Sequence, residues 1–258
     1  MFEVKNLSSA WKTTASEVFS NVSFALPQGK LTALCGVNGC GKSTLLSVMA
    51  GIPPVDLKVE GTVTVGSDQI LNQKAKDRAK NVAFLVQNET HAWEITGRRL
   101  VENGRFVHQK WYENTTEKDS QIVDKVIAQL ALTDLQNRPI SNLSGGELQR
   151  FRIARALAQE TPYILLDEPL AGLDLNYQKE LMQLLQQLCA QGKTICISIH
   201  DVNMAATYAH QMILMKKDRK GIFQGPPEEM FTPEVIEQTF GEGFKVFTHP
   251  VTGKVQII

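Results

Sequence analysis

Apolar residues recur along the first third of the chain in short runs separated by polar turns. The runs Phe2–Leu7, Val18–Leu26 and Lys30–Leu34 are rich in β-branched and aromatic residues, which favours strands. Gly61–Val65 and Asn81–Val86 have the same character and are bounded by turn residues. The first third of the chain is therefore predicted to contain five strands.

The pattern changes to a helical spacing from about residue 89 to residue 143. Five apolar residues in this stretch lie one, three or four positions apart and therefore share one helical face: Ile122, Val123, Val126, Ile127 and Leu130. The segment Trp93–Trp111 also has a mostly helical pattern. Residues 89–143 are therefore predicted to form a helical insertion in an α/β chain.

Strands and helices alternate again after this insertion. Tyr163–Leu166 and Thr194–Ile199 are short apolar runs of the kind found in buried parallel strands. Between them, Asp174–Ala190 has leucines on one helical stripe, and Gly192 is placed to end that helix. Strands that alternate with helices in this way predict a mostly parallel sheet.

The remainder of the chain is predicted to hold small elements. Gln211–Met215 and Gly221–Gln224 are expected to pair antiparallel across the charged turn 216–220. Because this turn is short and interrupted by Asp218, it is interpreted as a solvated turn and not as a lipid or nucleic-acid patch. Pro233–Phe240 predicts a short helix, and two short β-runs flank Gly253.

The composition is that of a globular protein. Of the 258 residues, 43% are hydrophobic and 21% are charged, which supplies a full apolar core and too little charge for disorder. The length suits one large domain with an insertion. Lys and Arg balance Asp and Glu at 27 each, and this neutrality disfavours a dedicated nucleic-acid binder, which typically has a basic excess.

The sequence also disfavours four further features: a membrane span, a secretory signal, disulfide bonds and a structural metal. No apolar run reaches the roughly 18 residues that would span a bilayer, and residues 1–14 lack the apolar core of a secretory signal. The cysteines form no CxxC pair, so reduced thiols are expected at Cys35, Cys40, Cys189 and Cys196. The histidines form no HxH or HxxxH pair, so no structural metal is expected.

A glycine-rich turn between a predicted strand and a predicted helix has the pattern of a P-loop. The turn is GVNGCGKST at residues 36–44, and glycines let successive backbone N–H groups point at an anion. The helix that starts near Lys42 adds its positive dipole end, Lys42 reaches the outer phosphates and Ser43 supplies a hydroxyl for Mg²⁺. We therefore expect the phosphates of a nucleotide, together with Mg²⁺, to bind at these residues: Gly36, Asn38, Gly39, Cys40, Gly41, Lys42, Ser43 and Thr44.

Two acidic residues follow the predicted strand Tyr163–Leu166. Asp167, at the strand end, is placed to hold Mg²⁺, and Glu168 is placed to polarise an attacking water. The alternative is a pair of solvated acids that ends a strand. The P-loop upstream favours the catalytic interpretation.

At this point the chain resembles a known family, the ATP-binding cassette ATPases. The stretch Leu143–Glu147, LSGGE, resembles the family's signature motif. The other motifs occur in the family's order: Gln87 resembles the Q-loop, 171–174 the D-loop, and His200 the switch histidine. Trp11 stands where the family places an aromatic residue that stacks on adenine, although a half-buried aromatic is the alternative. The resemblance covers essentially the whole chain.

The resemblance implies an α/β fold. It has a P-loop NTPase core with a mostly parallel sheet, an antiparallel β subdomain at the N-terminus and an inserted α-helical subdomain. The whole chain, 1–258, is then a single ATPase domain. Residues 1–88 and 144–225 form the nucleotide-binding core, 89–143 the helical subdomain and 226–258 a C-terminal extension.

The resemblance also assigns site residues. The catalytic residues are Glu168, His200, Gln87 and Lys42, and Mg²⁺ is held by Ser43, Gln87 and Asp167. Besides the P-loop, the ATP-binding residues are Trp11, Ser144, Gly145, Gly146 and Asp174. In this family two cassettes dock head to tail, so ATP is expected between one P-loop and the signature of a second copy.

A finer resemblance is to the cassettes of iron–siderophore, haem and cobalamin importers. It rests on GRFVH at 104–108, HDVNMAA at 200–206, and GPPEE at 225–229 with Thr232-Pro233. Leu148 and Val107 depart from the pattern of close relatives. This resemblance implies a homodimer on the cytoplasmic face of the inner membrane, working with a polytopic permease dimer and indirectly with a periplasmic or lipoprotein substrate-binding protein, and with no nucleic acid.

Three other functions are weighed against this importer subunit. One is an ATPase of a different transporter in the family, for metal ions or another small solute. Another is a soluble cassette ATPase without a transport role, which the single cassette and the absence of long heptads disfavour. The last is a non-catalytic nucleotide-gated module, which the presence of both Glu168 and His200 disfavours.

Overall fold

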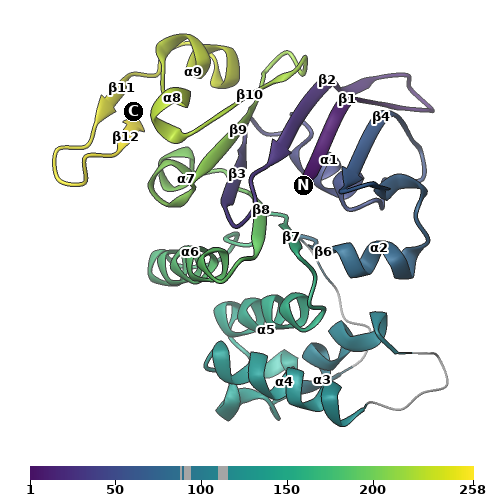
Figure 1. Ribbon diagram of the computed structural model, residues 1–258. Coiled ribbons are helices and arrows are strands. Elements are labelled where there is room, and N and C mark those ends of the chain that lie inside the picture. Colours follow the sequence, from purple (N-terminus) through teal and green to yellow (C-terminus); the bar gives the residue numbers. More distant parts are fainter. Residues whose placement is uncertain (88, 90–93, 110–115) are drawn as a thin grey trace.

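A six-stranded sheet forms the centre of the molecule in the computed structural model, which describes residues 1–87, 89, 94–109 and 116–258 (Figure 1). The strands lie in the order β10-β9-β3-β8-β7-β6. Their bounds are Ile222–Gly225 (β10), Gln211–Met215 (β9), Leu31–Cys35 (β3), Thr194–Ser198 (β8), Tyr163–Leu166 (β7) and Val82–Leu85 (β6). All neighbours from β9 to β6 pair in parallel, while β10 pairs antiparallel with β9. The predicted mostly parallel sheet is confirmed.

A four-stranded antiparallel sheet covers one side of this centre. It contains β1 (Phe2–Trp11), β2 (Glu17–Leu26), β4 (Leu57–Val65) and β5 (Asp68–Gln69), in the order β2-β1-β4-β5. Between the two sheets lies α1 (Lys42–Met49), whose Leu45 and Leu46 are fully buried in one core with residues from both sheets. The P-loop therefore leads into a helix that is held on both sides, which fixes the position of its N-terminus.

A second core lies on the other face of the central sheet. It includes residues of α3 (Gly97–Glu102), α4 (Glu117–Gln129), α5 (Gly145–Ala158), α6 (Leu175–Ala190) and α7 (Val202–Tyr208). Within it, Val123, Val126 and Ile127 of the predicted helical face are buried. In Figure 1, α3, α4 and α5 lie together at the bottom, away from the antiparallel sheet. The prediction of helices between the two parts of the α/β core is confirmed by α3 and α4.

A buried arginine holds this helical region against the core. Arg105 is 3% exposed, and its Nε donates to Asp119 Oδ1 over 2.8 Å. Its Nη1 donates to the carbonyl oxygen of Ala158 at 2.6 Å and to Glu160 at 2.8 Å, so it joins α4 to the end of α5. Burial alone would raise the pKa of Asp119, but hydrogen bonds from Arg105 and Thr116 hold that pKa well below its usual range. One motif of the finer resemblance, GRFVH at 104–108, thus supplies the arginine of structural ion pairs with Asp119 and Glu160.

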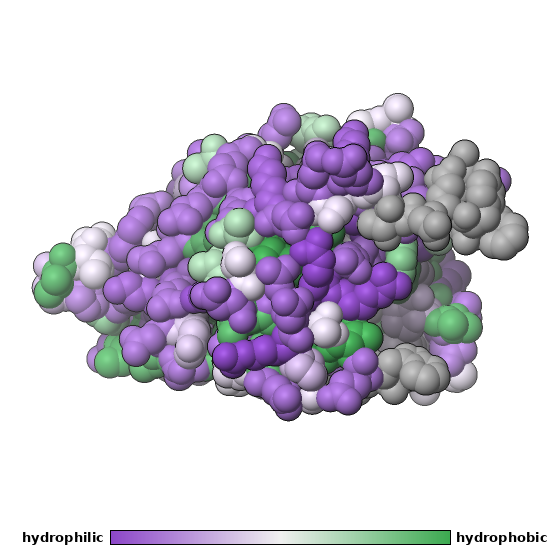
Figure 2. Space-filling model, turned by 90° about the horizontal axis from the view of Figure 1, so that it is seen from below, coloured by the Kyte–Doolittle hydropathy of each residue, from purple (hydrophilic) through white to green (hydrophobic). Residues whose placement is uncertain are grey.

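The helical side of the molecule has a mostly hydrophilic surface. Figure 2 views the molecule from this side, and hydrophobic side chains appear there in small separate patches among hydrophilic ones. Within the described residues, no helix has both the length and the apolar character needed to cross a membrane.

Some small elements were not predicted. They are α2 (Ala75–Asn81), α8 (Pro227–Met230), the short strand β5 and the 3₁₀ turn Ile70–Asn72. The 3₁₀ turns Asn103–Val107, Thr133–Leu135 and Ile140–Asn142 lie inside the segment that was predicted to be helical. Asn81 ends α2, so the predicted strand Asn81–Val86 is shortened to β6, and β4 starts earlier than predicted. Trp93 and Trp111 lie outside the described residues. The predicted helix α9 (Pro233–Phe240) and hairpin strands β11 (Val246–Thr248) and β12 (Val255–Ile257) are present.

All four cysteines are buried free thiols, as predicted. Burial raises the pKa of Cys189 and of Cys196 to about 12 each. Thiols with such pKa values are almost fully protonated at neutral pH and therefore react slowly.

Candidate nucleotide site

The turn between β3 and α1 has the backbone conformation that an anion cradle requires. Gly41 precedes α1 with φ of 102°, and no side chain caps this helix. A Cβ on Gly41 would lie 3.0 Å from Val18 Cγ1, so a larger residue would strain the turn. Lys42 is 5% exposed, and its Nζ donates to Gly36 O at 2.9 Å. Uncapped N–H groups and a lysine therefore meet at one helix N-terminus, which favours a phosphate ligand.

A pocket of about 540 Å³ opens beside this turn. Its lining includes most of the residues predicted from the sequence, brought from distant parts of the chain: Trp11, Asn38, Gly39, Gly41, Lys42, Ser43, Thr44, Gln87, Glu168 and His200. Val18 and Arg219 line it as well. The fold therefore places the P-loop, the aromatic residue and the candidate catalytic residues in one cavity.

Two hydroxyl groups hold the first acidic residue. Asp167 is 5% exposed, and its Oδ1 accepts hydrogen bonds from Ser43 Oγ at 3.1 Å and from Ser198 Oγ at 2.7 Å. Hydroxyl and carboxylate oxygens are the ligands that Mg²⁺ prefers, so Ser43 and Asp167 together fit this cation. Ser198 was not predicted, and it positions Asp167 from the end of β8.

The second acidic residue is held in place by two neighbours. Glu168 Oε2 accepts a hydrogen bond from Gln87 Nε2, and Oε1 lies 2.5 Å from His200 Nε2. The Glu168 N–H donates to Ser198 Oγ at 2.8 Å, and the residue has φ of 46°. A non-glycine residue in this left-handed region is disfavoured and is commonest at functional sites. Both carboxylate oxygens are thus engaged by polar groups that line the pocket.

The segment after Gln87 is tied to the helix that follows the signature. The carboxylate of Glu89 pairs with Arg155, with Oε2 at 2.8 Å from Nη2. Arg152 Nη2 also donates to the carbonyl oxygen of Glu89 at 3.0 Å. Because Arg152 and Arg155 both belong to α5, a shift of α5 would be transmitted to the neighbourhood of Gln87.

The signature segment forms a second helix N-terminus, away from the pocket. Ser144 caps α5: its Oγ accepts the Glu147 N–H at 3.3 Å, and its own N–H donates to Glu147 Oε2 at 2.8 Å. These hydrogen bonds lower the pKa of the Glu147 carboxyl. Ser144 and Gly145 are exposed, while a Cβ on Gly146 would lie 3.0 Å from the Tyr177 ring. The three signature residues are not among those that line the pocket.

The comparisons with known proteins agree on one family. A family model described as "ABC transporter" matches residues 19–171, which contain both the P-loop and the signature. The chain belongs to the ABC transporter family. It is an ATP-hydrolysing subunit of that family, which binds adenine nucleotides through the cassette fold.

Two curated relatives cover nearly all of this cassette. The iron(3+)-hydroxamate import ATP-binding protein FhuC of Bacillus subtilis is 39% identical over 238 residues, which is 92% of this chain and 87% of that protein. The ferric enterobactin transport ATP-binding protein FepC of Escherichia coli is 35% identical over 242 residues, covering 93% of this chain and 88% of that protein.

Solved structures of ABC proteins have the same fold as this cassette. A structure described as an inward-facing, metal-chelate type ABC transporter matches with a TM-score of 0.84 at 27% identity, over 100% of this chain and 96% of that chain. A dimeric ATP-binding cassette with bound ADP and Pi matches with a TM-score of 0.73 at 26% identity, over 88% and 98% of the two chains.

Besides the three signature residues, four predicted site residues are not among those that line the pocket of this cassette: Gly36, Cys40, Asp167 and Asp174. Cys40 is buried, with its Sγ 3.9 Å from Met215 Sδ, and Gly36 contributes the carbonyl that Lys42 contacts. Asp167 accepts a hydrogen bond from Ser43, which does line the pocket. Asp174 caps α6 by accepting the N–H groups of Asn176 at 3.0 Å and Tyr177 at 3.1 Å. Their parts in nucleotide binding stay predictions.

Three residues at or beside this pocket were not predicted from the sequence: Val18 and Arg219, which line it, and Ser198, which donates to Asp167. Val18 and Ser198 belong to strands in which the sequence indicated no functional residue. Their side chains lie at the site because β2 and β8 pass beside the P-loop. Arg219 lies in the charged turn that was interpreted as solvated. No local pattern marks any of the three, because each depends on the tertiary arrangement.

Proposed function

We propose that this cassette powers the import of an iron chelate, such as a siderophore or haem, or of cobalamin, through a partner permease. The observation that supports ATP hydrolysis most strongly is the meeting of Lys42, Glu168 and His200 in one pocket. The proposal for the cargo is supported by the relatives, which serve hydroxamate and enterobactin systems. The sequence motifs at 104–108 and 200–206 point the same way.

The proposed binding of the substrate follows from the geometry of the P-loop. Backbone N–H groups from Gly36 to Thr44 surround the phosphates, and Lys42 turns from the Gly36 carbonyl to the outer phosphates. Ser43, Gln87 and Asp167 would hold Mg²⁺, which when bound would balance the charge of the triphosphate. Trp11 stacks on the adenine, since it borders the same pocket.

In the proposed reaction, water attacks the γ-phosphorus and ADP leaves. Glu168 accepts a proton from this water, which requires that its carboxylate be released from Gln87 and His200. His200 would then contact the γ-phosphate, and Gln87 would be released to help hold Mg²⁺. Nucleotide binding would thus replace the contacts that Gln87 and His200 make with Glu168.

The site is proposed to be completed by a second copy of the chain. Ser144, Gly145 and Gly146 do not line the pocket of their own chain, yet they form a helix N-terminus suited to phosphate. In a head-to-tail homodimer, each signature would face the partner's γ-phosphate, with Asp174 near the interface. The dimeric cassette with bound ADP and Pi supports this arrangement.

The partners of the homodimer are proposed from the same resemblance. A polytopic permease dimer would dock on the helical subdomain, 89–143, and receive the motion of α5 through Arg155 and Glu89. The cassette would then lie on the cytoplasmic face of the membrane, with a substrate-binding protein on the other side. Residues 1–88 and 144–225 form the proposed core, and 226–258 the extension.

A reconstitution experiment tests this function. The cassette is combined in liposomes with a permease and binding protein encoded beside it, and ATP hydrolysis is measured with ferric hydroxamate, ferric enterobactin, haem and cobalamin. The proposal expects one of these ligands to stimulate hydrolysis, and to be transported only with ATP. ATP hydrolysis by the cassette without stimulation by any of the four would contradict the proposed cargo, while absence of hydrolysis would contradict the proposed mechanism.

A further inference from the structure

The turn between β9 and β10 reaches the nucleotide pocket from a direction that no sequence motif indicates. Arg219, in this turn, borders the same cavity as Trp11, Val18 and the P-loop. It lies far along the chain from all of them. The pocket therefore has a cationic wall in addition to Lys42.

Hydrogen bonds with β2 fix the position of Arg219. Its Nη1 donates to the Glu17 carbonyl oxygen at 3.1 Å, and its own carbonyl accepts the Ser20 N–H at 2.9 Å. The Gly221 N–H donates to Ser20 O at 2.8 Å. Because Val18 lies between Glu17 and Ser20 and packs against Gly41, the same strand positions both the turn and the P-loop.

The backbone of Arg219 is in an unfavourable conformation for an arginine. Its φ is 65°, in the left-handed region where glycine is preferred. A glycine would satisfy the turn and its backbone hydrogen bonds at lower conformational cost. Non-glycine residues in this region are commonest at functional sites, which agrees with the position of Arg219 at the pocket.

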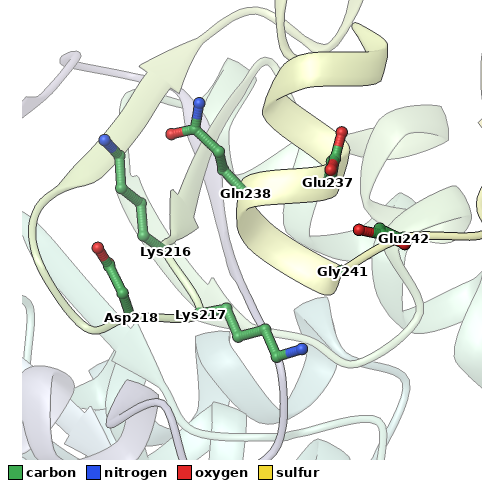
Figure 3. A pocket seen from close by; sticks show the side chains of 7 residues that line it. All are labelled: Lys216, Lys217, Asp218, Glu237, Gln238, Gly241 and Glu242. Atoms are coloured by element: carbon green, nitrogen blue, oxygen red, sulfur yellow. The ribbon is translucent and has the colours of Figure 1, made fainter.

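The other side of the turn rests on the C-terminal helix α9. The Lys217 N–H donates to Gln238 O at 2.9 Å, and a cavity of about 620 Å³ lies between the turn and α9. Figure 3 shows the side chain of Lys217 extending past the end of α9 near Gly241, while Asp218 lies on the turn side. Charges of both signs line this cavity, so it has no clear ligand preference, but its walls support the turn that carries Arg219.

We propose that Arg219 is a nucleotide-binding residue, whose guanidinium contacts the anionic phosphate portion of the nucleotide from the β2 side of the pocket. This inference rests on the proposed nucleotide site. A guanidinium has five N–H donors, and the bond to Glu17 O uses one nitrogen, so donors remain for a phosphate oxygen. Burial raises the pKa of Cys40 in the P-loop, and the charges of Lys42 and Arg219 oppose that rise, which places the positive potential of Arg219 at the loop.

The variant Arg219→Gly tests the proposal without straining the turn. It removes the guanidinium and suits the left-handed backbone, so the thermal stability of the nucleotide-free protein should not fall. The affinity of the full chain for Mg-ATP and for ADP, measured by calorimetry, should fall roughly tenfold, as is typical for a charge-assisted hydrogen bond. The ratio of wild-type to variant affinity should shrink as salt rises, because salt screens the interaction of charges.

Lys220→Ala is the matched control, since it removes a neighbouring charge that does not line the pocket. It should bind ATP as the wild type does. Binding by Arg219→Gly within twofold of the wild type, an affinity ratio that does not change with salt, or an equal loss in Lys220→Ala would each overturn the proposal. The proposed nucleotide site is tested separately: the wild type should bind ATP, and Lys42→Ala should bind it more weakly. If the wild type itself binds no ATP, the proposed function fails, and not merely the role of Arg219.

Discussion

The P-loop end and the signature end of this cassette share one feature: each is a helix N-terminus with glycines beside it. The two helix ends differ in how their N–H groups are capped. At α1 no side chain caps the helix, so its N–H groups are left for a ligand, and a buried lysine lies beside them. At α5 Ser144 and Glu147 cap the helix reciprocally, and a negative charge sits at its start. The first end is therefore proposed to hold the triphosphate, and in the proposed homodimer the second end adds contacts to a phosphate that the other chain holds.

The two ends also differ in what surrounds them. Glu168, His200 and Gln87 gather at the P-loop end, and Asp167 is fixed there by two hydroxyl groups. No such group of residues lines the signature end among the described residues. Chemistry is therefore expected to depend on the first end in one chain and on the second end in its partner.

The largest expected effect on turnover comes from replacing Glu168, the proposed general base at the P-loop end. In Glu168→Gln the amide cannot accept a proton from water, so kcat should fall on the order of 10³-fold. ATP affinity and ATP-induced dimerisation should persist, because the phosphate contacts are unchanged. Steady-state hydrolysis and light scattering provide the measurements, and wild-type turnover in this variant would remove Glu168 from its proposed role.

A change at the signature end should reduce turnover while sparing the binding of ATP. A Cβ on Gly145 would meet only Leu173, at 3.9 Å, so the fold tolerates a side chain there. Gly145→Asp places a negative charge where the partner's phosphate is expected, and kcat should fall roughly 10²-fold, as for the loss of a preorganised donor. The affinity of the monomer for ATP should change less than about twofold, because Gly145 is outside its own pocket.

Gly145→Ala is the control for this change, because it adds the Cβ without the charge. It should keep most of the activity. Equal losses in the alanine and aspartate variants would indicate damage to α5 and would contradict a contact with phosphate.

The adenine contact is expected to have a smaller effect. Trp11→Ala should weaken ATP binding by about 1–3 kcal/mol if the indole stacks on the base. The measurement is the affinity for ATP and for a triphosphate without a base. A loss of the same size for both ligands would mean that Trp11 supports the pocket without touching adenine.

How far the sequence predicts this arrangement depends on how local each feature is. The P-loop, the acids after β7 and the helix α9 follow from contiguous residues, and the structure has them where the sequence indicates. Helix α2 was missed because it buries none of its residues and so has no apolar periodicity. Ser198 and Arg219 were missed because they reach the site through strand order, which a single sequence does not specify.

The structure also shows why the boundary of β1 was missed. The predicted strand ended at Leu7, but β1 continues through polar residues to Trp11. Its pairing with β2 and β4 contains register shifts along this length. Asn6 has φ of 50° at this point, and a Cβ on Gly61 would lie 2.5 Å from the Asn6 carbonyl oxygen. A glycine is needed at 61 because the two strands approach closely, and this is a tertiary requirement.

The smallest expected effect concerns the cap of α5 and its dependence on pH. Because the folded pKa of Glu147 lies below its unfolded value of about 4.3, its contribution to stability is present above that pH and is lost as the pH falls through the folded pKa. Glu147→Gln should therefore lower the unfolding temperature at pH 7 by on the order of 1 °C, and by less at pH 3. Unfolding curves at the two pH values measure this, and an equal difference at both would contradict it.

Mixing two inactive variants tests most directly whether each ATP site combines the P-loop of one chain with the signature of the other. Lys42→Ala keeps an intact signature, and Gly145→Asp keeps an intact P-loop. In a mixed head-to-tail dimer, one of the two shared sites has both intact ends, so an equimolar mixture should regain up to about a quarter of wild-type ATPase activity. Activity no higher than that of either variant alone would contradict a site shared between two chains.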